Sequence, residues 1–294
     1  MRVIKYKNKI LNFSRKINIF SSLTSGCGDA DVNAFFALSD MSEANLAAWL
    51  GTIGKTYAEV KEAVCDFITS LKTDLLYNKG GSDALYLPIG FTAAQRKYNF
   101  YNPVDSNAAF RLTFNGGNTF TNFAIQGNGV NGYCNTFWIP NSNASTTTAA
   151  FGVDIETDVP TTPTSKIILG AYRNTNLGRM WANVGLTTGN IQIASNSAIT
   201  FTGVRNGLFF SRRTSATFNQ SYREATSLGT LTTTFNPLPV VPIYLNALNN
   251  DGPPAFYCTN GVRMALLSGG NYSEADYLNF RTAYNTFKTN LGIV

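Results

Sequence analysis

Residues 96–140 read RKYNFYNPVDSNAAFRLTFNGGNTFTNFAIQGNGVNGYCNTFWIP, and this stretch decides the class of fold. Its short aromatic runs are interrupted by Asn-Pro, Asn-Gly-Gly and Gly-Asn-Gly, which is how β-strands joined by tight turns look in a sequence. Within residues 109–114 the apolar Phe110, Leu112 and Phe114 alternate with Ala, Arg and Thr, so we expect one face of this strand to be core and the other to face water. The stretch therefore predicts a mainly β protein.

The same pattern of short strands and tight turns continues after residue 140. Short apolar or alternating runs are separated by turns rich in Gly and Asn, at a spacing typical of a two-sheet β-sandwich. No repeat of fixed period is visible, which disfavours propellers and solenoids. The predicted strands cover residues 149–155, 166–172, 180–184, 207–212, 218–223, 230–235, 242–248 and 262–267.

Helical periodicity appears on both sides of the β region. Asp29 is expected to cap a short helix, Ser42 to open a second that ends before Gly51, and Thr56 with Glu59 to form a capping box for a third. That third helix, over residues 56–77, carries one apolar stripe, and a closing helix over residues 273–291 carries an aromatic stripe and stops at Gly292. The third helix's stripe consists of Val60, Val64, Phe67, Ile68, Leu71 and Leu75.

These signals divide the chain into three parts. We predict a basic arm and linker over residues 1–28, a helical subdomain over 29–81, and a β-sandwich with its closing helix over 82–294. We expect the closing helix to pack on the outside of the sandwich or on the N-terminal helices. At 294 residues the chain is long enough to bury a substantial core.

The positive charge is confined to the arm. Of 23 Lys and Arg residues six lie in the arm, which contains no acid, and the other 17 balance the 17 acidic residues. A neutral body disfavours nucleic-acid binding by the folded surface. The arm's basic residues are Arg2, Lys5, Lys7, Lys9, Arg15 and Lys16.

The arm also interleaves strand-forming apolar residues with its basic ones. Three interpretations stay open: docking on another chain by strand addition, an edge strand of this protein's own sheet, and binding to nucleic acid. In the first, the arm anchors the body to an acidic partner.

Several kinds of chemistry lose support from the composition. The chain has no histidine, which removes Ser-His-Asp and Cys-His catalysis and every His-ligated metal, and we expect neither metal nor cofactor. Cys27, Cys65, Cys134 and Cys258 form no C-x-x-C pair, so we expect four buried free thiols. No run of 18 apolar residues predicts a membrane span, and no apolar core of a signal peptide is present.

A resemblance to a known family rests on spaced motifs. The chain resembles bacteriophage virion proteins that carry a concanavalin A-like lectin/glucanase jelly roll. It departs from them at Asn118, where the family often has an aromatic residue. The matching residues are NPVD at 102–105, NAAFRLTFNGG at 107–117, Asn128-Gly129, Tyr133, Thr136-Phe137, Pro140, and YSEAD at 272–276 through Leu291-Gly292.

The resemblance implies a concanavalin A-like β-sandwich (jelly roll) with a small N-terminal helical subdomain and a C-terminal helix. It further implies a structural virion protein on the particle surface, made in the bacterial cytoplasm and multimeric in the particle, with other virion proteins as partners and host surface glycans as candidate ligands. The alternative is a purely architectural capsid decoration or connector protein.

Candidate binding residues are aromatics and arginines, since flat rings stack on sugars and the guanidinium fork grips carboxylates. The alternatives are core packing for the aromatics and hydrogen bonds to loops for the arginines. The candidates are Trp138, Tyr172, Arg173, Trp181, Arg212 and Arg213.

Asp154, Glu156 and Asp158 alternate along a predicted strand, as catalytic acids do in some glycoside hydrolases of this fold. The order of acids is the reverse of the hydrolase pattern, so a solvated strand end is the competing interpretation. Three acids alone do not supply the six oxygen ligands of a calcium ion. We therefore expect no catalysis, with a glycoside hydrolase as the residual alternative.

Overall fold

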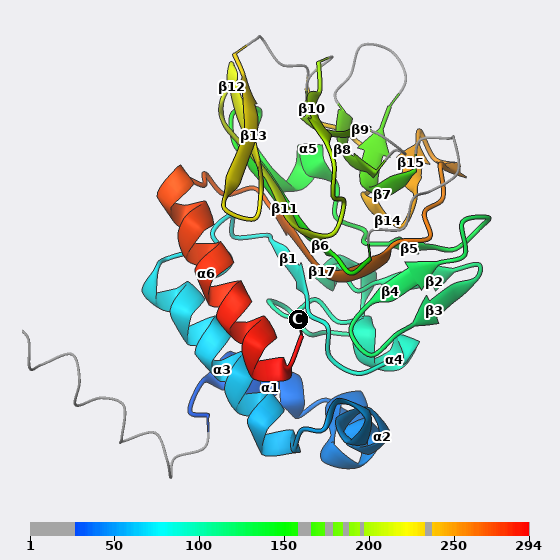
Figure 1. Cartoon of the computed structure of the whole chain (residues 1–294), viewed down its shortest axis with the longest axis vertical. Helices are drawn as coiled ribbons and strands as arrows, with labels where there is room; N and C mark the ends of the chain where they lie inside the picture. The colour runs from blue at the N-terminus through cyan, green and yellow to red at the C-terminus, as the bar shows by residue number, and fades with distance from the viewer. Residues whose placement is uncertain are drawn as a thin grey trace, which may run out of the picture.

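The computed structural model describes residues 27–157, 166–173, 179–184, 188–194, 197–232 and 237–293. Two β-sheets pack face to face, and a layer of helices lies against the outer side of one sheet (Figure 1). The predicted fold class, a mainly β sandwich with N-terminal helices and a closing helix, is confirmed.

The first sheet has eight strands and carries the helices. Its order is β13 (Thr226–Leu231), β12 (Phe218–Arg223), β11 (Gly207–Ser215), β6 (Ala149–Ile155), β17 (Gly261–Ser268), β4 (Ile125–Gly127) and β3 (Asn118–Phe120), with β1 (Ala84–Tyr86) also paired to β17. All its pairs are antiparallel.

The second sheet has nine strands. Its order is β10 (Ile199–Thr202), β9 (Thr188–Ile193), β8 (Arg179–Val184), β7 (Ile167–Tyr172), β14 (Tyr244–Leu245), β5 (Tyr133–Asn135) and β2 (Thr113–Asn115), with β15 (Leu248–Asn250) and β16 (Pro254–Ala255) beside this path. β15 runs parallel to β7, whereas the other pairs are antiparallel.

The helices follow local signals in the sequence. They are α1 (Ala30–Phe36), α2 (Glu43–Ile53), α3 (Tyr57–Thr73), α4 (Ala93–Arg96), α5 (Pro140–Asn143) and α6 (Glu274–Leu291), with 3₁₀ turns η1 (Ser39–Met41) and η2 (Asn107–Ala109). Thr56 and Glu59 form the predicted capping box of α3, and Ser273 with Asp276 forms one for α6. Gly292 ends α6 in the left-handed conformation, as its lack of a Cβ allows.

Two layers of apolar side chains hold the molecule together. Phe151 and Val153 of β6 face Leu169 and other residues of the second sheet in the layer between the sheets. The second layer lies between the first sheet and the helices, where Phe210 of β11 stacks on Tyr277 of α6 at 4.8 Å between ring centroids.

α6 also packs against α3, and the two helices run side by side in Figure 1. Phe67 of α3 contacts the rings of Phe280, Tyr284 and Phe287 at 5.1–6.1 Å. The closing helix α6 thus packs against both the outside of the sandwich and the N-terminal helices, the two alternatives predicted for it. The helices and the first sheet share one continuous core.

Several predicted boundaries were wrong. The strand predicted over 109–114 is a 3₁₀ turn followed by Phe110 in the left-handed conformation (φ 60°), and β2 begins only at Thr113. α2 continues through Gly51 and ends at Gly54, because tertiary packing overrides the poor helix propensity of glycine. Leu75 lies beyond the end of α3 at φ 58° and is 78% exposed, while Leu76 is buried instead.

The later strand predictions differ in accuracy. The runs predicted at 149–155 and 218–223 coincide with β6 and β12. Of the run predicted at 230–235, Thr230 and Leu231 are the last two residues of β13, which begins earlier, at Thr226. Residue 232 is not in a strand, and residues 233–235 lie outside the described part. The run at 242–248 is divided between β14 and β15 by Asn246, which adopts a positive φ.

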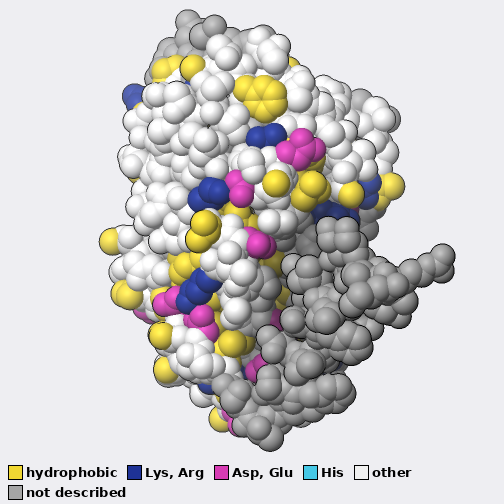
Figure 2. Space-filling model, turned by 90° about the vertical axis from the view of Figure 1, so that its left-hand side faces the viewer, with side chains coloured by type: hydrophobic (Ala, Val, Ile, Leu, Met, Phe, Trp, Pro, Cys, Tyr) yellow, Lys and Arg dark blue, Asp and Glu magenta, His cyan; other side chains and the backbone are white. Residues whose placement is uncertain are grey.

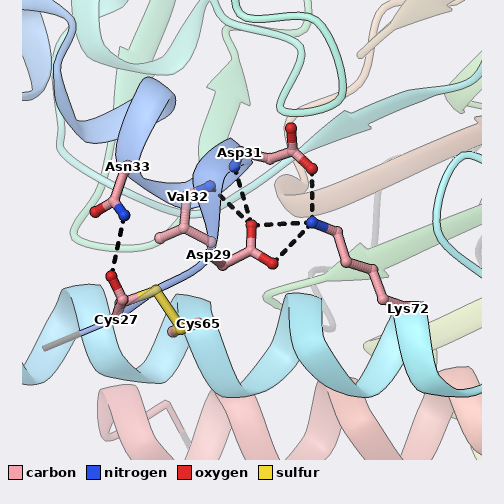
Figure 3. The surroundings of a disulfide bond; sticks show 7 residues. All are labelled: Cys27, Asp29, Asp31, Val32, Asn33, Cys65 and Lys72. Atoms are coloured by element: carbon pink, nitrogen blue, oxygen red, sulfur yellow. Dashed lines mark hydrogen bonds and ion pairs between the residues drawn. A yellow bond between two sulfur atoms is a disulfide. The ribbon is translucent and has the colours of Figure 1, made fainter. Parts of the chain in front are cut away.

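The cysteine expectation was half wrong. Cys27 and Cys65 form a disulfide with their Cα atoms 5.8 Å apart (Figure 3). It ties the segment that precedes α1 to the middle of α3. Lys72 adds ion pairs to Asp29 and Asp31 at 2.7 and 2.6 Å. Cys134 and Cys258 are buried free thiols, as predicted.

Candidate functional site

The outer face of the nine-stranded sheet carries aromatic and polar side chains along β7, β8 and β9. Side chains alternate along a strand, and Met180, Ala182 and Ile191 point into the core. The intervening Trp181 and Gln192 therefore share the opposite face, and the register places them directly opposite one another. Tyr172 and Arg179 pair in the neighbouring row.

Three of these side chains form a compact group, which we call the β7–β8 face: Tyr172, Arg179 and Trp181. The rings of Tyr172 and Trp181 lie 6.2 Å apart at 44°. The guanidinium carbon of Arg179 lies 5.0 Å from the Tyr172 ring centre and 5.3 Å from that of Trp181. Cation–π contacts of this kind hold an arginine in place while leaving its N–H groups to donate.

The indole of Trp181 has an unused donor. Its Nε1 is buried but has no hydrogen-bond partner among the described residues. The side chain as a whole is half-buried, as is Tyr172. A buried N–H without a partner is uncommon in proteins, so this atom is a natural contact for a ligand oxygen.

An ion pair borders the β7–β8 face. Arg173 follows β7 and lies 3.6 Å from Asp251, and both side chains are about half exposed. The backbone N–H of Asp251 donates to the carbonyl of Tyr172 at 2.9 Å, which fixes the Asp251 loop beside the strand. Exposed pairs like this one contribute little stability, so both groups remain available to a ligand.

Three predicted binding residues do not belong to this surface. Trp138 is completely buried and donates from Nε1 to the carbonyl of Ser82 at 2.7 Å, so it is a core residue. Arg212 is 7% exposed and donates to the carbonyl of Tyr272 at 3.0 Å, in agreement with the alternative of loop hydrogen bonds. Arg213 is 2% exposed on β11 and donates to the carbonyl of Ser215, and burial lowers its pKa to about 10.

Sequence reasoning missed Arg179, although a signal was present. Tyr172 and Trp181 were candidates as single aromatics, and a β-hairpin between them would have placed residue 179 opposite residue 172. The sequence between residues 172 and 179 contains no Asn-Gly pair of the kind that fixes the register of a hairpin, so the pairing could not be predicted.

The candidate acids do not form an open catalytic pair. Asp154 is completely buried beneath α6, where it accepts from the Tyr284 hydroxyl at 2.8 Å and lies 3.3 Å from Arg263. Glu156 accepts from the Thr121 hydroxyl at 3.2 Å. Asp158 lies outside the described residues.

Two further searches cover only the described part of the chain. No three Asp, Glu, Cys or His side chains gather there as ligands of a metal ion. Its helices are all too short or too polar to cross a bilayer.

No protein family matches the chain, and no curated protein matches it in sequence. Among solved structures, a Trypanosoma rangeli sialidase mutant displaying trans-sialidase activity has a TM-score of 0.51 at 10% identity, covering 77% of this chain and 39% of the sialidase. The same sialidase in complex with 2,3-difluoro-KDN has a TM-score of 0.51 at 8% identity, with 79% and 41% covered. The NanB sialidase of Streptococcus pneumoniae has a TM-score of 0.37 at 10% identity, with 48% of this chain and 25% of NanB covered.

The chain spans less than half the length of these sialidases. The similarity to the Trypanosoma rangeli sialidase concerns the fold. It nevertheless corrects one expectation. We expected a chain without histidine and without an acid pair not to be an enzyme, but the β-fold is shared with sialidases, which are glycoside hydrolases. The absence of histidine and of an acid pair therefore does not show that this chain is not an enzyme.

Proposed function

We propose that the β-sandwich is a glycan-binding interaction module, with the β7–β8 face as its binding surface. The observation that carries the proposal is the arrangement of Tyr172, Arg179 and Trp181, two half-buried rings with a guanidinium held between them. Aromatic faces stack on the C–H groups of a sugar ring, and the guanidinium fork and the Trp181 N–H donate to its oxygens.

The surroundings of the β7–β8 face support the same ligand class. Thr200 donates to the side-chain oxygen of Asn190 at 3.0 Å on the adjoining strands, so amide and hydroxyl groups continue across the sheet. The body is neutral, with 17 acidic residues against the 17 basic residues outside the arm. Neutral hydrogen-bonding surface suits hydroxyl-rich ligands, and Arg179 adds a preference for a carboxylate.

The setting of this module is also a proposal. We place it on the surface of a bacteriophage particle, in several copies, with the basic arm anchoring it to an acidic virion protein. Support comes from the residues that resemble virion proteins, at 102–140 and 272–292, and from the confinement of positive charge to the arm. Deletion of residues 2–20 should leave a folded body that no longer enters particles, and normal incorporation would refute the anchoring role.

A glycan array probed with tetramerised protein tests the binding function. We expect selected glycans to bind, and Trp181→Ala to reduce their binding about fivefold, since an aromatic stack contributes about 1 kcal/mol beyond its buried area. Arg179→Lys keeps the charge but loses the fork, so its effect should be confined to glycans with a carboxylate. Leu278→Ala, which changes an exposed apolar residue on α6, is the matched control.

The same experiment reports on hydrolysis. Mass spectrometry of the recovered glycans shows whether a bound glycan has been shortened. Absence of binding to every glycan, together with a position between other virion proteins in a particle reconstruction, would refute glycan binding and leave an architectural role.

A further inference from the structure

A groove runs between α3 and α6 on the side of the molecule away from the β7–β8 face. It consists of a hollow of about 190 Å³ and one of about 350 Å³, which share Asp66 as a lining residue. α6 contributes uncharged Thr and Asn side chains to it, among them Thr282 and Thr286. Figure 2 shows this side of the molecule, where acidic and basic side chains lie among uncharged ones.

The α3 wall of the groove is acidic. Glu59, Glu62, Asp66 and Asp74 all line it, against Lys55 as the cation among the described lining residues of these two hollows. Glu62, Asp66 and Asp74 form no ion pair with any described residue, whereas Asp31 of α1 pairs with Lys72 and Asp276 of α6 pairs with Lys79. Burial raises the pKa of Asp66, and no neighbouring cation offsets this.

The basic arm starts beside this groove. Cys27, the first described residue, is bonded to Cys65, and the next residue of α3 is Asp66 (Figure 3). The 26 residues before Cys27 contain six basic residues and no acid. Ten residues separate Lys16 from Cys27, which span up to about 33 Å when extended, and the α3 wall is only about 24 Å long.

We infer that the N-terminal arm folds back into the groove between α3 and α6 of its own molecule, with its Lys and Arg side chains against Glu62, Asp66 and Asp74. The inference is independent of glycan binding. We assign the groove to the arm of the same chain and not to that of a second copy, because the contacts are weak. One exposed ion pair changes an equilibrium constant only about two- to fivefold. A few such pairs are too weak to hold a second copy at micromolar concentration, but a tether supplies an effective concentration of about millimolar.

This arrangement has a consequence for assembly. A partner with a more acidic or more apolar docking surface would displace the arm from the groove, so the arm remains shielded until the partner is present. Salt weakens the contact, since exposed charges are screened within about 8 Å at physiological ionic strength.

Zero-length carbodiimide cross-linking of the full chain tests the inference. The sample is an equal mixture of ordinary and ¹⁵N-labelled protein at low salt, and peptides are identified by mass spectrometry. We expect links from arm lysines to Glu62, Asp66 or Asp74 within one isotope form. Links between the two isotope forms would show that the arm of a second copy occupies the groove. Lys97 and Asp105, 2.7 Å apart, serve as the positive control for coupling, and absence of arm links while this pair is coupled would show an empty groove. Either result overturns the inference.

A charge variant of the full chain gives an independent readout. Trypsin should cleave the arm of the triple variant Glu62→Gln, Asp66→Asn, Asp74→Asn about tenfold faster than that of the wild type at low salt, with the two rates converging at high salt. The matched control Glu43→Gln, Asp105→Asn, Glu274→Gln removes the same charge from other exposed positions and should behave as wild type. Equal rates for all three proteins would refute docking in the groove.

Discussion

At the scale of single residues, the stability of the fold depends on a carboxyl group, that of Asp154, which is buried between β6 and α6. Asp154 accepts from Tyr284 through one oxygen, and its other oxygen has no partner among the described residues. Arg263 and Lys288 lie 3.3 and 3.9 Å from the same oxygen as Tyr284. Among the described residues, the Tyr284 hydroxyl therefore donates the single hydrogen bond that the Asp154 carboxyl group accepts. If this hydroxyl is removed, no other described hydrogen bond to Asp154 remains.

We predict that Tyr284→Phe lowers the free energy of unfolding by about 2 kcal/mol, because leaving a buried polar group without its hydrogen-bond partner costs about 1–3 kcal/mol. The ring remains, so its packing against Phe67 and Phe287 is kept. Urea unfolding at neutral pH measures the change. Tyr57→Phe, which removes a hydroxyl from a half-buried ring with a 3.3 Å bond to the carbonyl of Phe36, serves as the control and should cost less.

Asp154 also predicts a dependence on pH. Burial raises its pKa, an effect that Arg263, Lys288 and Tyr284 only partly offset. A carboxyl with a raised folded-state pKa stabilises the fold below its unfolded value near 3.8, and this stabilisation is lost as the pH rises through the folded value. In urea unfolding at pH 4, 6 and 8, the stability advantage of wild type over Asp154→Asn should shrink with rising pH; growth of that advantage would contradict the assignment.

The residue scale also shows where sequence reasoning fails. The alternation of Asp154 and Glu156 on one strand face was visible, but the burial of that face was not, because it depends on a helix that begins 118 residues after Glu156, at Glu274. The prediction of Trp138 as a binding residue was wrong because its burial also depends on distant parts of the chain. Its ring fills the space between two sheets whose pairing no local pattern reveals.

At the scale of elements, helices with capping signals were predictable and short strands were not. The capping residues fix the helix ends through hydrogen bonds to residues three or four positions away in the sequence. Thr56 bonds with Glu59 at the start of α3, and in α6 Ser273 bonds with Asp276 at the start and Gly292 with Lys288 at the end. The strands between residues 113 and 135 are three residues long. β2 pairs with β5 and β3 with β4 inside this stretch, but β4 and β5 are positioned by the distant strands β17 and β14. Their existence could be predicted from turns, but their bounds could not.

The disulfide is the element-scale contact that the sequence did not predict, since 38 residues separate its cysteines. We predict that Cys27→Ser with Cys65→Ser lowers the free energy of unfolding by about 2–4 kcal/mol, because the bond closes a long loop in the unfolded chain. Thermal unfolding with and without reductant checks this. Reductant should destabilise the wild type and leave the double variant unchanged; an equal response of both proteins would show that the bond contributes nothing.

At the scale of the whole molecule, the sandwich separates two surfaces. The helices cover the eight-stranded sheet and form the groove near Cys27, while the β7–β8 face lies on the other sheet (Figure 1). A body anchored through its arm would therefore present the β7–β8 face away from the anchor. This geometry suits a module that works in many copies on one particle.

We predict that binding to a glycan depends on the number of linked copies. One aromatic stack and two or three hydrogen bonds together supply roughly 4 kcal/mol, which corresponds to a Kd of about 1 mM for a single copy. Four linked copies facing a dense glycan layer should bind about 10²–10⁴ times more tightly without any new contact. Surface plasmon resonance of monomer and tetramer on one glycan surface measures the ratio, with Trp181→Ala weakening both forms and Leu278→Ala neither. Equal affinities for monomer and tetramer would show that the β7–β8 face does not act through avidity.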